Sequence, residues 1–589
     1  MRGKRRPSMR HLSLCAVLLV CVTSGARSQT MPPDAQTKSA IFNIRTYGAV
    51  GDGKALDTVA IRKAIQECAR HGGGTVTFPP GRYVTGTFEL LSNVTLYLDA
   101  GAVIVGSTNL EDYGSIAAYG FGRDYGVNST GEGYRVGLIV ARGAENVAIL
   151  GRGAIDGNGD AFMDLHVPHI SADFDAQYTR QGMSFLRAMR DTAFGPVEPK
   201  MDGQGRPGTM VIFANCRNVL LRDVSLRNGP NWTLHFQNSE GVVVSGVHIQ
   251  SSLLIPNDDG LDCIGCRHVH VSDCDIQSGD DDFAFVNSED INVTNCSLVS
   301  RSSAIRLENT RFATFQNLTI HSNRGIGIYD HAGESTEEVM FSDISIETKL
   351  ITGHWWGKAE PIYIAVSPAR PGQAGGQLRD VRFSNIMATA ESGIVIYGSE
   401  DRSIKGLGFD HIKLRIVAPA PKISEAVGGN FDLRWTATSL SNAIFEHDIP
   451  GIYCQYVEGF RIHDFQLEWG DDLPSYFSHG IECDDFKDLV IDTFVGRQAH
   501  PSSQDAVIAL KRGERVAIQN STASEGSGTF LLLSGVSDER SFVNNDCGSA
   551  KRAMQPGTSG FKMSGNILPT QPNLDRMHPW NQPPRKKAP

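Results

Sequence analysis

Residues 268–300 read HVHVSDCDIQSGDDDFAFVNSEDINVTNCSLVS and contain two copies of one pattern. In HVHVSDCDIQS (268–278) and DINVTNCSLVS (290–300), apolar and polar side chains alternate, a small polar pair follows, and a short apolar segment ends the unit. Alternation with a period of two is typical of β-strands that have one buried face. Each unit therefore predicts a strand, a kink and a second short strand.

The same unit recurs along the chain at a spacing of roughly 22 to 27 residues, which is the range of repeat architectures. Further copies are NVLLRDVSLRN (218–228), GVVVSGVHIQS (241–251), FATFQNLTIHS (312–322), EVMFSDISIET (338–348), DVRFSNIMATA (380–390), GFRIHDFQLEW (459–469), DLVIDTFVGRQ (488–498) and RVAIQNSTASE (515–525). No amphipathic helix lies between consecutive copies, which excludes leucine-rich and α/β solenoids. The sequence therefore predicts an all-β fold, a parallel β-helix in which each repeat forms one coil.

The two ends of the chain differ in composition from the repeats. Residues 1–29 combine a basic start, a short apolar core and small residues, as in a secretory signal peptide, so a secreted protein (periplasmic or extracellular) is expected. No later stretch predicts a membrane span. Residues 566–589 are Pro-rich and basic and predict a disordered tail.

Between these ends we expect an N-terminal cap with the first coils over 41–107 and a β-helix over 108–565. Residues 57–71 have helical periodicity, with Asp57 as a possible N-cap, and this helix would cover the first open sheet edge. Insertions are predicted at 160–205, with a possible helix near 177–189, and at 415–450.

Charge and cysteine content restrict the class of partner. The formal charge is −10, which argues against nucleic-acid binding. Nine cysteines remain after residue 29, an odd number that cannot pair completely within one chain. Cys274 and Cys296 occupy matching places in successive repeats, so they are predicted to stack as small inward-facing side chains, although a disulfide between coils stays open. The sequence leaves the oligomeric state open.

Two clusters of acids flank the repeat at 268–278. NDDGLD (257–262) precedes it and SGDDD (278–282) follows it, and Asp259 and Asp280 are 21 positions apart, close to one coil. Neighbouring coils would bring the clusters to about 4.8 Å, the spacing of strands in a sheet. Like charges this close raise at least one pKa, and a protonated acid beside an ionised carboxylate is what glycoside hydrolysis needs. The alternatives are turn-capping aspartates and a Ca²⁺ site.

Several segments, in order, carry a resemblance to a known family. They are NIRTYGAVGDG (43–53), GGGTVTFPPGRY (72–83), GRGAIDGNG (151–159), NGPNWTLHF (228–236), NDDGLD (257–262) and SGDDDFAF (278–285). Together they resemble glycoside hydrolase family 28, the polygalacturonase family, and its long bacterial-type members. The resemblance implies a right-handed, pectin-lyase-like parallel β-helix with an N-terminal capping helix.

The resemblance also implies roles for three aspartates. Asp280 would be the general acid, and Asp259 and Asp281 would hold and deprotonate the attacking water. Inversion at the sugar carbon is implied, a mechanism in which the carboxyl groups are about 6.5–9.5 Å apart. Other residues of the same motifs are expected to bind substrate, namely Asn257, Asp258, Asp262 and Asp282.

The sequence departs from the family pattern at two places. Ser302, Ser303 and Ala304 stand where the family has Gly-His-Gly, and Gly327 and Tyr329 stand where it has an Arg-x-Lys pair that binds a uronate carboxylate. Two nearby cations, Arg306 and Arg324, are expected to bind substrate instead; the alternative is that they are solvated turn residues. Without the pair, a substrate less charged than polygalacturonate is expected.

Trp355 and Trp356 follow the acidic repeats and are expected to stack on a sugar face, the alternative being that one is buried and one covers the edge of the groove. We therefore expect a secreted glycoside hydrolase that cleaves a pectic or related plant polysaccharide or oligosaccharide, with no cofactor and no metal ion. The alternatives are a Ca²⁺-dependent polysaccharide lyase on the same fold and a non-catalytic carbohydrate-binding β-helix.

Overall fold

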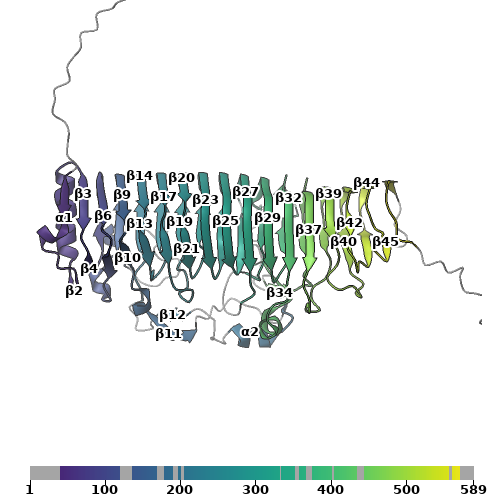
Figure 1. Cartoon of the computed structure of the whole chain (residues 1–589), viewed down its shortest axis with the longest axis horizontal. Helices are drawn as coiled ribbons and strands as arrows, with labels where there is room; N and C mark the ends of the chain where they lie inside the picture. The colour runs from purple at the N-terminus through teal and green to yellow at the C-terminus, as the bar shows by residue number, and fades with distance from the viewer. Residues whose placement is uncertain are drawn as a thin grey trace, which may run out of the picture. The chain divides into compact units, whose positions relative to one another are not determined.

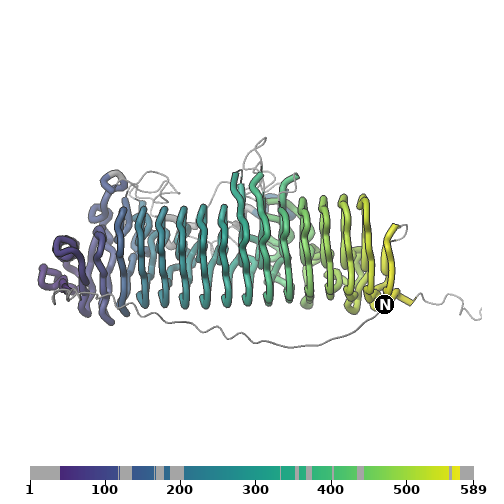
Figure 2. Tube along the Cα trace, turned by 90° about the horizontal axis from the view of Figure 1, so that it is seen from above, coloured from purple at the N-terminus to yellow at the C-terminus, as the bar shows by residue number. Residues whose placement is uncertain are grey.

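The computed structural model describes residues 40–119, 135–168, 178–189, 197–199, 205–331, 333–351, 357–366, 375–400, 404–433, 444–555 and 560–570. The described residues from 40 to 570 form coils that stack along one axis (Figures 1 and 2). Each coil contributes strands to two large parallel sheets, one with 15 strands and one with 27 in the described residues. The predicted parallel β-helix is confirmed.

The 15-stranded sheet is called the site sheet below. Its strands are β5 (Phe88–Glu89), β8 (Ile139–Arg142), β13 (Val211–Ala214), β16 (Leu234–Gln237), β19 (Leu261–Ile264), β22 (Phe283–Val286), β24 (Ser303–Glu308), β26 (Arg324–Asp330), β28 (Ile362–Val366), β30 (Ile394–Tyr397), β35 (Ile452–Gln455), β38 (Ile481–Asp484), β40 (Ala506–Lys511), β43 (Thr529–Ser534) and β45 (Arg552–Met554).

The larger sheet forms the rest of each coil. Its strands are β1 (Ile41–Asn43), β2 (Asp52–Leu56), β3 (Gly74–Phe78), β4 (Gly81–Thr85), β6 (Val94–Leu98), β7 (Ala102–Gly106), β9 (Glu145–Gly151), β10 (Ala154–Asp156), β14 (Arg217–Arg222), β15 (Ser225–Arg227), β17 (Glu240–Ser245), β18 (His248–Gln250), β20 (Arg267–Ser272), β21 (Asp275–Ser278), β23 (Glu289–Ser300), β25 (Arg311–Ser322), β27 (Ser335–Thr348), β29 (Gln377–Ala390), β31 (Ile404–Lys405), β32 (Gly408–Ile416), β36 (Val457–Glu458), β37 (Arg461–Trp469), β39 (Lys487–Gly496), β41 (Glu514–Gln519), β42 (Thr522–Ala523), β44 (Ser537–Val543) and β46 (Phe561–Ser564).

The alternation seen in the sequence sets the inward face of each coil. Equivalent apolar residues of successive coils are register partners, so like side chains lie above one another inside the stack. Phe315, Phe341 and Phe383 show this, because their rings stack with centroids 5.0 and 4.7 Å apart. Burying one such side chain contributes about 1.5–3 kcal/mol, so a continuous column of them stabilises the coil register.

The kink between the two parts of a repeat is held by asparagine and aspartate. Asn295 and Asn317 have φ angles of 57° and 53°, a left-handed backbone that asparagine tolerates better than most residues. The Asn295 amide donates to Asp273 at 3.1 Å, and the Asn317 amide donates to Asn295 at 2.7 Å. This ladder ties the kinks of neighbouring coils together.

Helix α1 (Thr58–Arg70) packs on the first strands and covers the end of the stack, as predicted. Its apolar face, which includes Ile61, Ile65 and Cys68, is buried. Asp57 is the N-cap residue, as predicted, but its side chain makes no cap hydrogen bond and instead accepts from the backbone N–H groups of Val50 and Gly51 at 2.7 and 3.0 Å.

All nine cysteines from Cys68 to Cys547 are reduced and buried. Cys274 and Cys296 face the interior of the stack, which confirms the preferred interpretation of this pair as small core residues. Of the helices in the described residues, none is long and apolar enough to cross a membrane.

Long insertions leave the stack at the corner where the chain enters the site sheet. Four of these segments are 107–138 before β8, 157–210 before β13, 349–361 before β28 and 417–451 before β35. The described parts of the second and fourth contain 3-10 helix η4 (Gly159–Phe162), α2 (Met183–Met189), α3 (Pro421–Val427) and two short antiparallel pairs. These pairs are β11 (Met163–Pro168) with β12 (Val197–Pro199) and β33 (Asn430–Asp432) with β34 (Ile444–Glu446). They lie along one edge of the stack (Figure 1).

The two longest insertions contact each other through α2 and α3. Phe185 of α2 shares a small apolar cluster with Val427 and Ile444, and Arg180 binds Asp448 at 2.6 Å. The helix predicted near 177–189 is therefore present but begins at Met183. The remaining 3-10 helices are η1 (Ile44–Tyr47), η2 (Leu110–Asp112) and η3 (Ala117–Tyr119).

Candidate active site

Two acidic turns occupy the corner from which the insertions leave. Asp258 and Asp259 lie just before β19, and the three acids from Asp280 to Asp282 lie just before β22. The turns stack directly, because the N–H groups of Gly260 and Leu261 donate to the carbonyls of Asp281 and Asp282 at 2.8 and 2.9 Å. The predicted juxtaposition of the two acid clusters is therefore present.

Glycine is required at position 260 for this close approach. A Cβ atom there would lie 2.6 Å from the Ile276 side chain and 2.7 Å from the Asp282 carbonyl, well inside contact distance. The NDDGLD motif thus combines carboxylates with the one residue that lets the next coil approach them.

Four carboxylates gather at the outer face of these turns and are almost completely buried. Asp259, Asp280 and Asp281 are each 4% exposed, and Asp262 at the outward position of β19 is 1% exposed. Among the described residues, Oδ1 of Asp259 and Oδ2 of Asp262 are buried without a hydrogen-bond partner. Buried, under-satisfied carboxylates are costly for folding, which is why they mark candidate functional sites.

Burial raises the pKa values of all four acids. Burial raises the pKa of Asp280 to about 7, the charge of Asp281 adds to the rise, and Ser302 and Arg306 oppose it. Burial also raises the pKa of Asp281, but Arg306 and hydrogen bonds from Ser303 act against that rise. The pKa values of Asp259 and Asp262 lie well above normal, chiefly through burial and then through neighbouring carboxylates.

Arg306 is the cation that faces the cluster. It lies on the outward side of β24, two register steps from Asp262 with the small Ala284 between them. Its Nη1 is 3.6 Å from Oδ2 of Asp281, and its Nε donates to Glu308 at 3.0 Å. The Arg306 side chain is 23% exposed, so it remains a candidate substrate contact that already shares its charge with two acids.

Arg324 lies elsewhere and does not fit the expected contact with substrate. It is 1% exposed, and its Nε and Nη2 donate to Glu360 at 3.1 and 3.0 Å. Its Nη1 donates to the Tyr329 hydroxyl at 2.8 Å, and its guanidinium lies 3.6 Å from the centroid of the Tyr363 ring. A guanidinium enclosed in this way is not accessible to a sugar.

Asp258 and Asp282 are also too deeply buried for the expected substrate contact. Both are fully buried; Asp258 accepts from Thr233 at 3.1 Å and Asp282 accepts from Ser278 at 2.7 Å. These bonds favour a role in pinning the turns. Asn257, half-buried with a φ of 52°, remains a candidate contact. Trp355 and Trp356 lie outside the described residues.

Several supporting residues were not anticipated from the sequence. Arg206, from the insertion before β13, is 1% exposed and donates to the carbonyls of Pro230 and Pro256 at 3.0 and 2.7 Å, which fixes the chain just before Asn257. Glu308 and Glu360 neutralise the two arginines. No local motif signals these residues, because their partners are set by the register of coils that are far apart in sequence.

His235 lies on β16, one register step before Asp262. It is completely buried, and burial lowers its pKa to about 4, so it is neutral near pH 7. Its Nε2 is 3.1 Å from Gln237, and its ring packs on Trp232 with centroids 5.2 Å apart. A neutral, enclosed imidazole supports the wall of the site and does not supply a positive charge to it.

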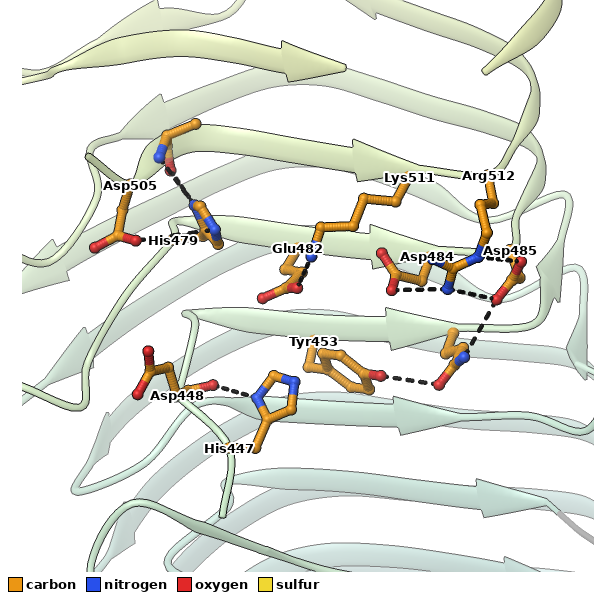
Figure 3. A network of polar contacts seen from close by, with 12 residues as sticks. His447, Asp448, Tyr453, His479, Glu482, Asp484, Asp485, Asp505, Lys511 and Arg512 are labelled. Atoms are coloured by element: carbon orange, nitrogen blue, oxygen red, sulfur yellow. Dashed lines mark hydrogen bonds and ion pairs between the residues drawn. The ribbon is translucent and has the colours of Figure 1, made fainter. Parts of the chain in front are cut away.

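A second acidic region lies further along the site sheet. On β38 and the turn after it are Glu482, Asp484 and Asp485, and on β40 and its turn are Lys511 and Arg512 (Figure 3). Lys511 pairs with Glu482, and Arg512 pairs with Asp484 and Asp485 at 3.1 and 2.9 Å. Every acid named here faces a cation, unlike the acids at β19 and β22.

Comparisons with known proteins agree with this geometry. The model of "Glycosyl hydrolases family 28" matches residues 195–426, and the model "Rhamnogalacturonase A/epimerase, pectate lyase-like" matches residues 41–173. The chain is 27% identical to "Probable polygalacturonase" of Vitis vinifera over 282 residues, which is 46% of this chain and 50% of that protein. It is 28% identical to "Exo-poly-alpha-D-galacturonosidase" of Dickeya chrysanthemi over 271 residues, 45% of this chain and 44% of that protein. The chain thus spans about half the length of these relatives.

Two solved structures share the fold. A hyperthermoactive exopolygalacturonase from Thermotoga maritima has a TM-score of 0.50 and 23% identity, covering 64% of this chain and 87% of its own. The family 28 exopolygalacturonase of Yersinia enterocolitica has a TM-score of 0.53 and 19% identity, covering 77% and 78%. These likenesses confirm the right-handed coil. Both acidic motifs, at 257–262 and 278–282, lie inside the segment that the model of glycosyl hydrolases family 28 matches.

Proposed function

We propose that the protein is a polygalacturonase-like glycoside hydrolase that cleaves a glycosidic bond of a pectic polysaccharide or oligosaccharide, with inversion. The observation that carries this proposal is the group of Asp259, Asp262, Asp280 and Asp281, which are buried together and face the single cation Arg306 within the described part of the site. Acids pushed to different pKa values in one place are suited to acid–base work.

Asp280 is the proposed general acid. With a pKa of about 7 it carries its proton at neutral and mildly acidic pH, and it gives that proton to the departing oxygen. Asp281 is the proposed base, since Arg306 and Ser303 favour its charged form, and Asp259 helps to hold the water. Protons in so tight a group belong to the group as a whole, so activity should follow macroscopic pKa values.

We propose that the substrate is less charged than polygalacturonate. Arg306 is shared by Asp281 and Glu308, and Arg324 is enclosed by Glu360 and two tyrosines, so neither offers a free charge to a uronate carboxylate. A rhamnosyl or galactosyl pectic linkage places neutral hydroxyls against the acids instead. A secreted location also remains a proposal, because the predicted signal at 1–29 lies outside the described residues.

The test is to incubate purified protein with pectic oligosaccharides and polygalacturonate and to follow the products by proton NMR. Release of a new reducing end with inverted anomeric configuration supports the proposal. An unsaturated product that absorbs in the ultraviolet indicates a lyase, and binding without any cleavage indicates a carbohydrate-binding protein. Asp275→Asn is a suitable control for Asp280→Asn, because Asp275 lies on β21 of the same coil, exposed, and pairs with His248 at 3.0 Å.

A further inference from the structure

A continuous line of buried polar contacts leads from Glu360 to Asp281. Arg324 donates to Glu360 through two nitrogens and to the Tyr329 hydroxyl through a third, at 2.8 Å. The Tyr329 hydroxyl is 3.1 Å from the Ser303 hydroxyl. The backbone N–H of Ser303 donates to Oδ1 of Asp281 at 3.2 Å. Three neighbouring coils are thereby linked to one carboxylate of the candidate active site.

The chemistry of the arginine gives this line a direction. A guanidinium only donates hydrogen bonds, so the Tyr329 oxygen accepts from Arg324. The tyrosine hydrogen is then available for Ser303, and the serine hydrogen is in turn available for Asp281. Burial raises the pKa of Tyr329, so its hydroxyl keeps that hydrogen near neutral pH. Each hydroxyl along the line can therefore donate toward the carboxylate.

The local structure keeps Tyr329 in this place. Both Tyr329 and Arg324 are 1% exposed, so neither is available to a sugar. The tyrosine ring lies over Gly327, where a Cβ atom would come within 2.6 Å of it. A residue with a side chain at 327 would displace the ring, which explains why these two positions depend on each other.

We propose that Tyr329 is a positioning residue, whose hydroxyl, held by the Arg324–Glu360 pair, orients Ser303 so that Asp281 is kept as the charged carboxylate beside Asp280. The proposal rests on the function proposed above, and it assigns a role to a residue that does not touch the substrate. It also explains why a buried arginine–glutamate pair is placed two coils away from the acids.

Other groups also face Asp281 and must be kept constant in any test. The carboxylates are Asp259 and Asp262 from the preceding coil and Asp280 and Asp282 from its own turn, and the cation is Arg306 from β24, backed by Glu308. Replacing Tyr329 by phenylalanine leaves all of these in place and retains the ring over Gly327. The variant loses the two hydrogen bonds of the hydroxyl, the one with Ser303 and the one that Arg324 donates.

The experiment compares the pH dependence of kcat/KM in wild type and Tyr329→Phe. The acidic limb, set by the base Asp281, should move to higher pH by about half to one unit, because one hydrogen bond to the charged form has been weakened. The basic limb, set by Asp280, should move less. Ser303→Ala should reproduce the shift, which keeps the proposal testable if one variant folds poorly.

Tyr363→Phe is the matched control. Tyr363 is also 1% exposed and lies against Arg324, yet its hydroxyl has no hydrogen-bond partner among the described residues. The acidic limb should therefore keep its position in this variant. An unchanged acidic limb in Tyr329→Phe, or an equal shift in Tyr363→Phe, overturns the proposal.

A readout without substrate separates this proposal from the proposed function. The infrared carboxyl band of Asp281 is isolated by subtracting the spectrum of Asp281→Asn in each background, and its titration is followed with pH. The midpoint should rise in Tyr329→Phe and Ser303→Ala but not in Tyr363→Phe. If wild type cleaves no substrate, the proposed function fails while this titration still decides the role of Tyr329; an unmoved midpoint overturns that role.

Discussion

The coils at β19–β24 and the coils at β35–β40 present acids on the same face of one sheet, but the two sets of carboxylates differ in how many cations they pair with. In the later coils Glu482 pairs with Lys511, and Asp484 and Asp485 pair with Arg512, so three carboxylates face two cations (Figure 3). In the earlier coils four buried carboxylates share Arg306. Paired acids only support the fold, whereas a concentration of unneutralised charge costs stability and indicates a function.

The largest expected difference between the two regions is catalytic. Asp280→Asn should lower kcat by roughly 10²–10⁴-fold, because the amide cannot supply a proton to the departing oxygen. Glu482→Gln in the later coils should leave kcat within about twofold, since Lys511 and Glu482 are far from the acids along the sheet. Steady-state rates with intact far-ultraviolet circular dichroism measure both. Comparable losses in the two variants would remove the distinction.

Replacing an arginine that faces acids should destabilise the protein more at β19–β24 than at β35–β40. Arg306→Gln leaves buried carboxylates without compensation, so we expect a decrease in the free energy of unfolding on the order of 3 kcal/mol. It should also move the acidic limb of activity to higher pH, because Arg306 lowers the pKa of Asp281. Arg512→Gln, with an exposed side chain, should cost less than about 1 kcal/mol. Denaturant unfolding checks this, and equal losses would contradict it.

The charge of the substrate provides a further test of the acids at β19–β24. A uronate that enters beside Asp259 and Asp280 meets like charges without a free cation, so kcat/KM on polygalacturonate should be about 10- to 100-fold below that on a neutral pectic glycoside. Rates at matched ionic strength with polygalacturonate, rhamnosyl and galactosyl oligosaccharides provide the measurement. If polygalacturonate is the best substrate, Arg306 is able to leave its acids and bind a carboxylate.

Stability should depend on pH in opposite ways at two single aspartates, Asp330 on β26 and Asp488 on β39. Burial raises the pKa of Asp330 on β26 to about 7, so the folded state holds a proton that the unfolded chain has lost. That contribution is present below about pH 4 and disappears as the pH rises to 7, with a slope of up to about 1.4 kcal/mol per pH unit. Asp330→Asn should flatten this decline in the free energy of unfolding.

Asp488 is the control for that measurement. Its pKa is lowered by the hydrogen bond from Arg515, so its contribution is complete above the ordinary aspartate range and is lost only in stronger acid. Asp488→Asn should therefore leave the slope between pH 4 and 7 unchanged. A parallel slope in Asp330→Asn and wild type would show that Asp330 ionises normally.

The smallest expected effect concerns the tryptophan pair. Replacing Trp355 or Trp356 by alanine should raise KM by a few fold and change kcat less, because stacking on a sugar contributes about equally to ground-state and transition-state binding. The kinetics of both variants, alongside their melting temperatures, make the comparison. Unaltered KM in both would leave a purely structural role for these residues.

The repeat and the acid motifs could be predicted from the sequence because their signals are local. Alternating side chains define each coil, and the spacing of Asp259 and Asp280 is close to one coil, so their proximity follows from the fold. The helix at 58–70 could also be predicted, from its apolar periodicity. These predictions needed only the period of the chain.

The partners of Arg324 and Asp258 could not be predicted, because they are set by register. Arg324 binds Glu360, which lies 36 residues later in the sequence. The insertion between them means that their proximity cannot be counted from the period of the repeat. Asp258 lies beside Asp259 in sequence, yet its side chain is fully buried and bonds Thr233 of the preceding coil. Which of two adjacent acids faces outward depends on turn geometry that composition does not reveal.

One corner of the stack carries four long insertions, and this has a consequence for how the protein can change. Residues 157–210 separate β10 from β13, yet β10 still pairs in register with β15 and with β7. Because the entropy of closing a loop grows only as the logarithm of its length, doubling such a segment costs about 0.6 kcal/mol. The surface around the acids can thus be lengthened, trimmed or exchanged without disturbing the coils beneath, so new specificities can evolve there at little cost to folding.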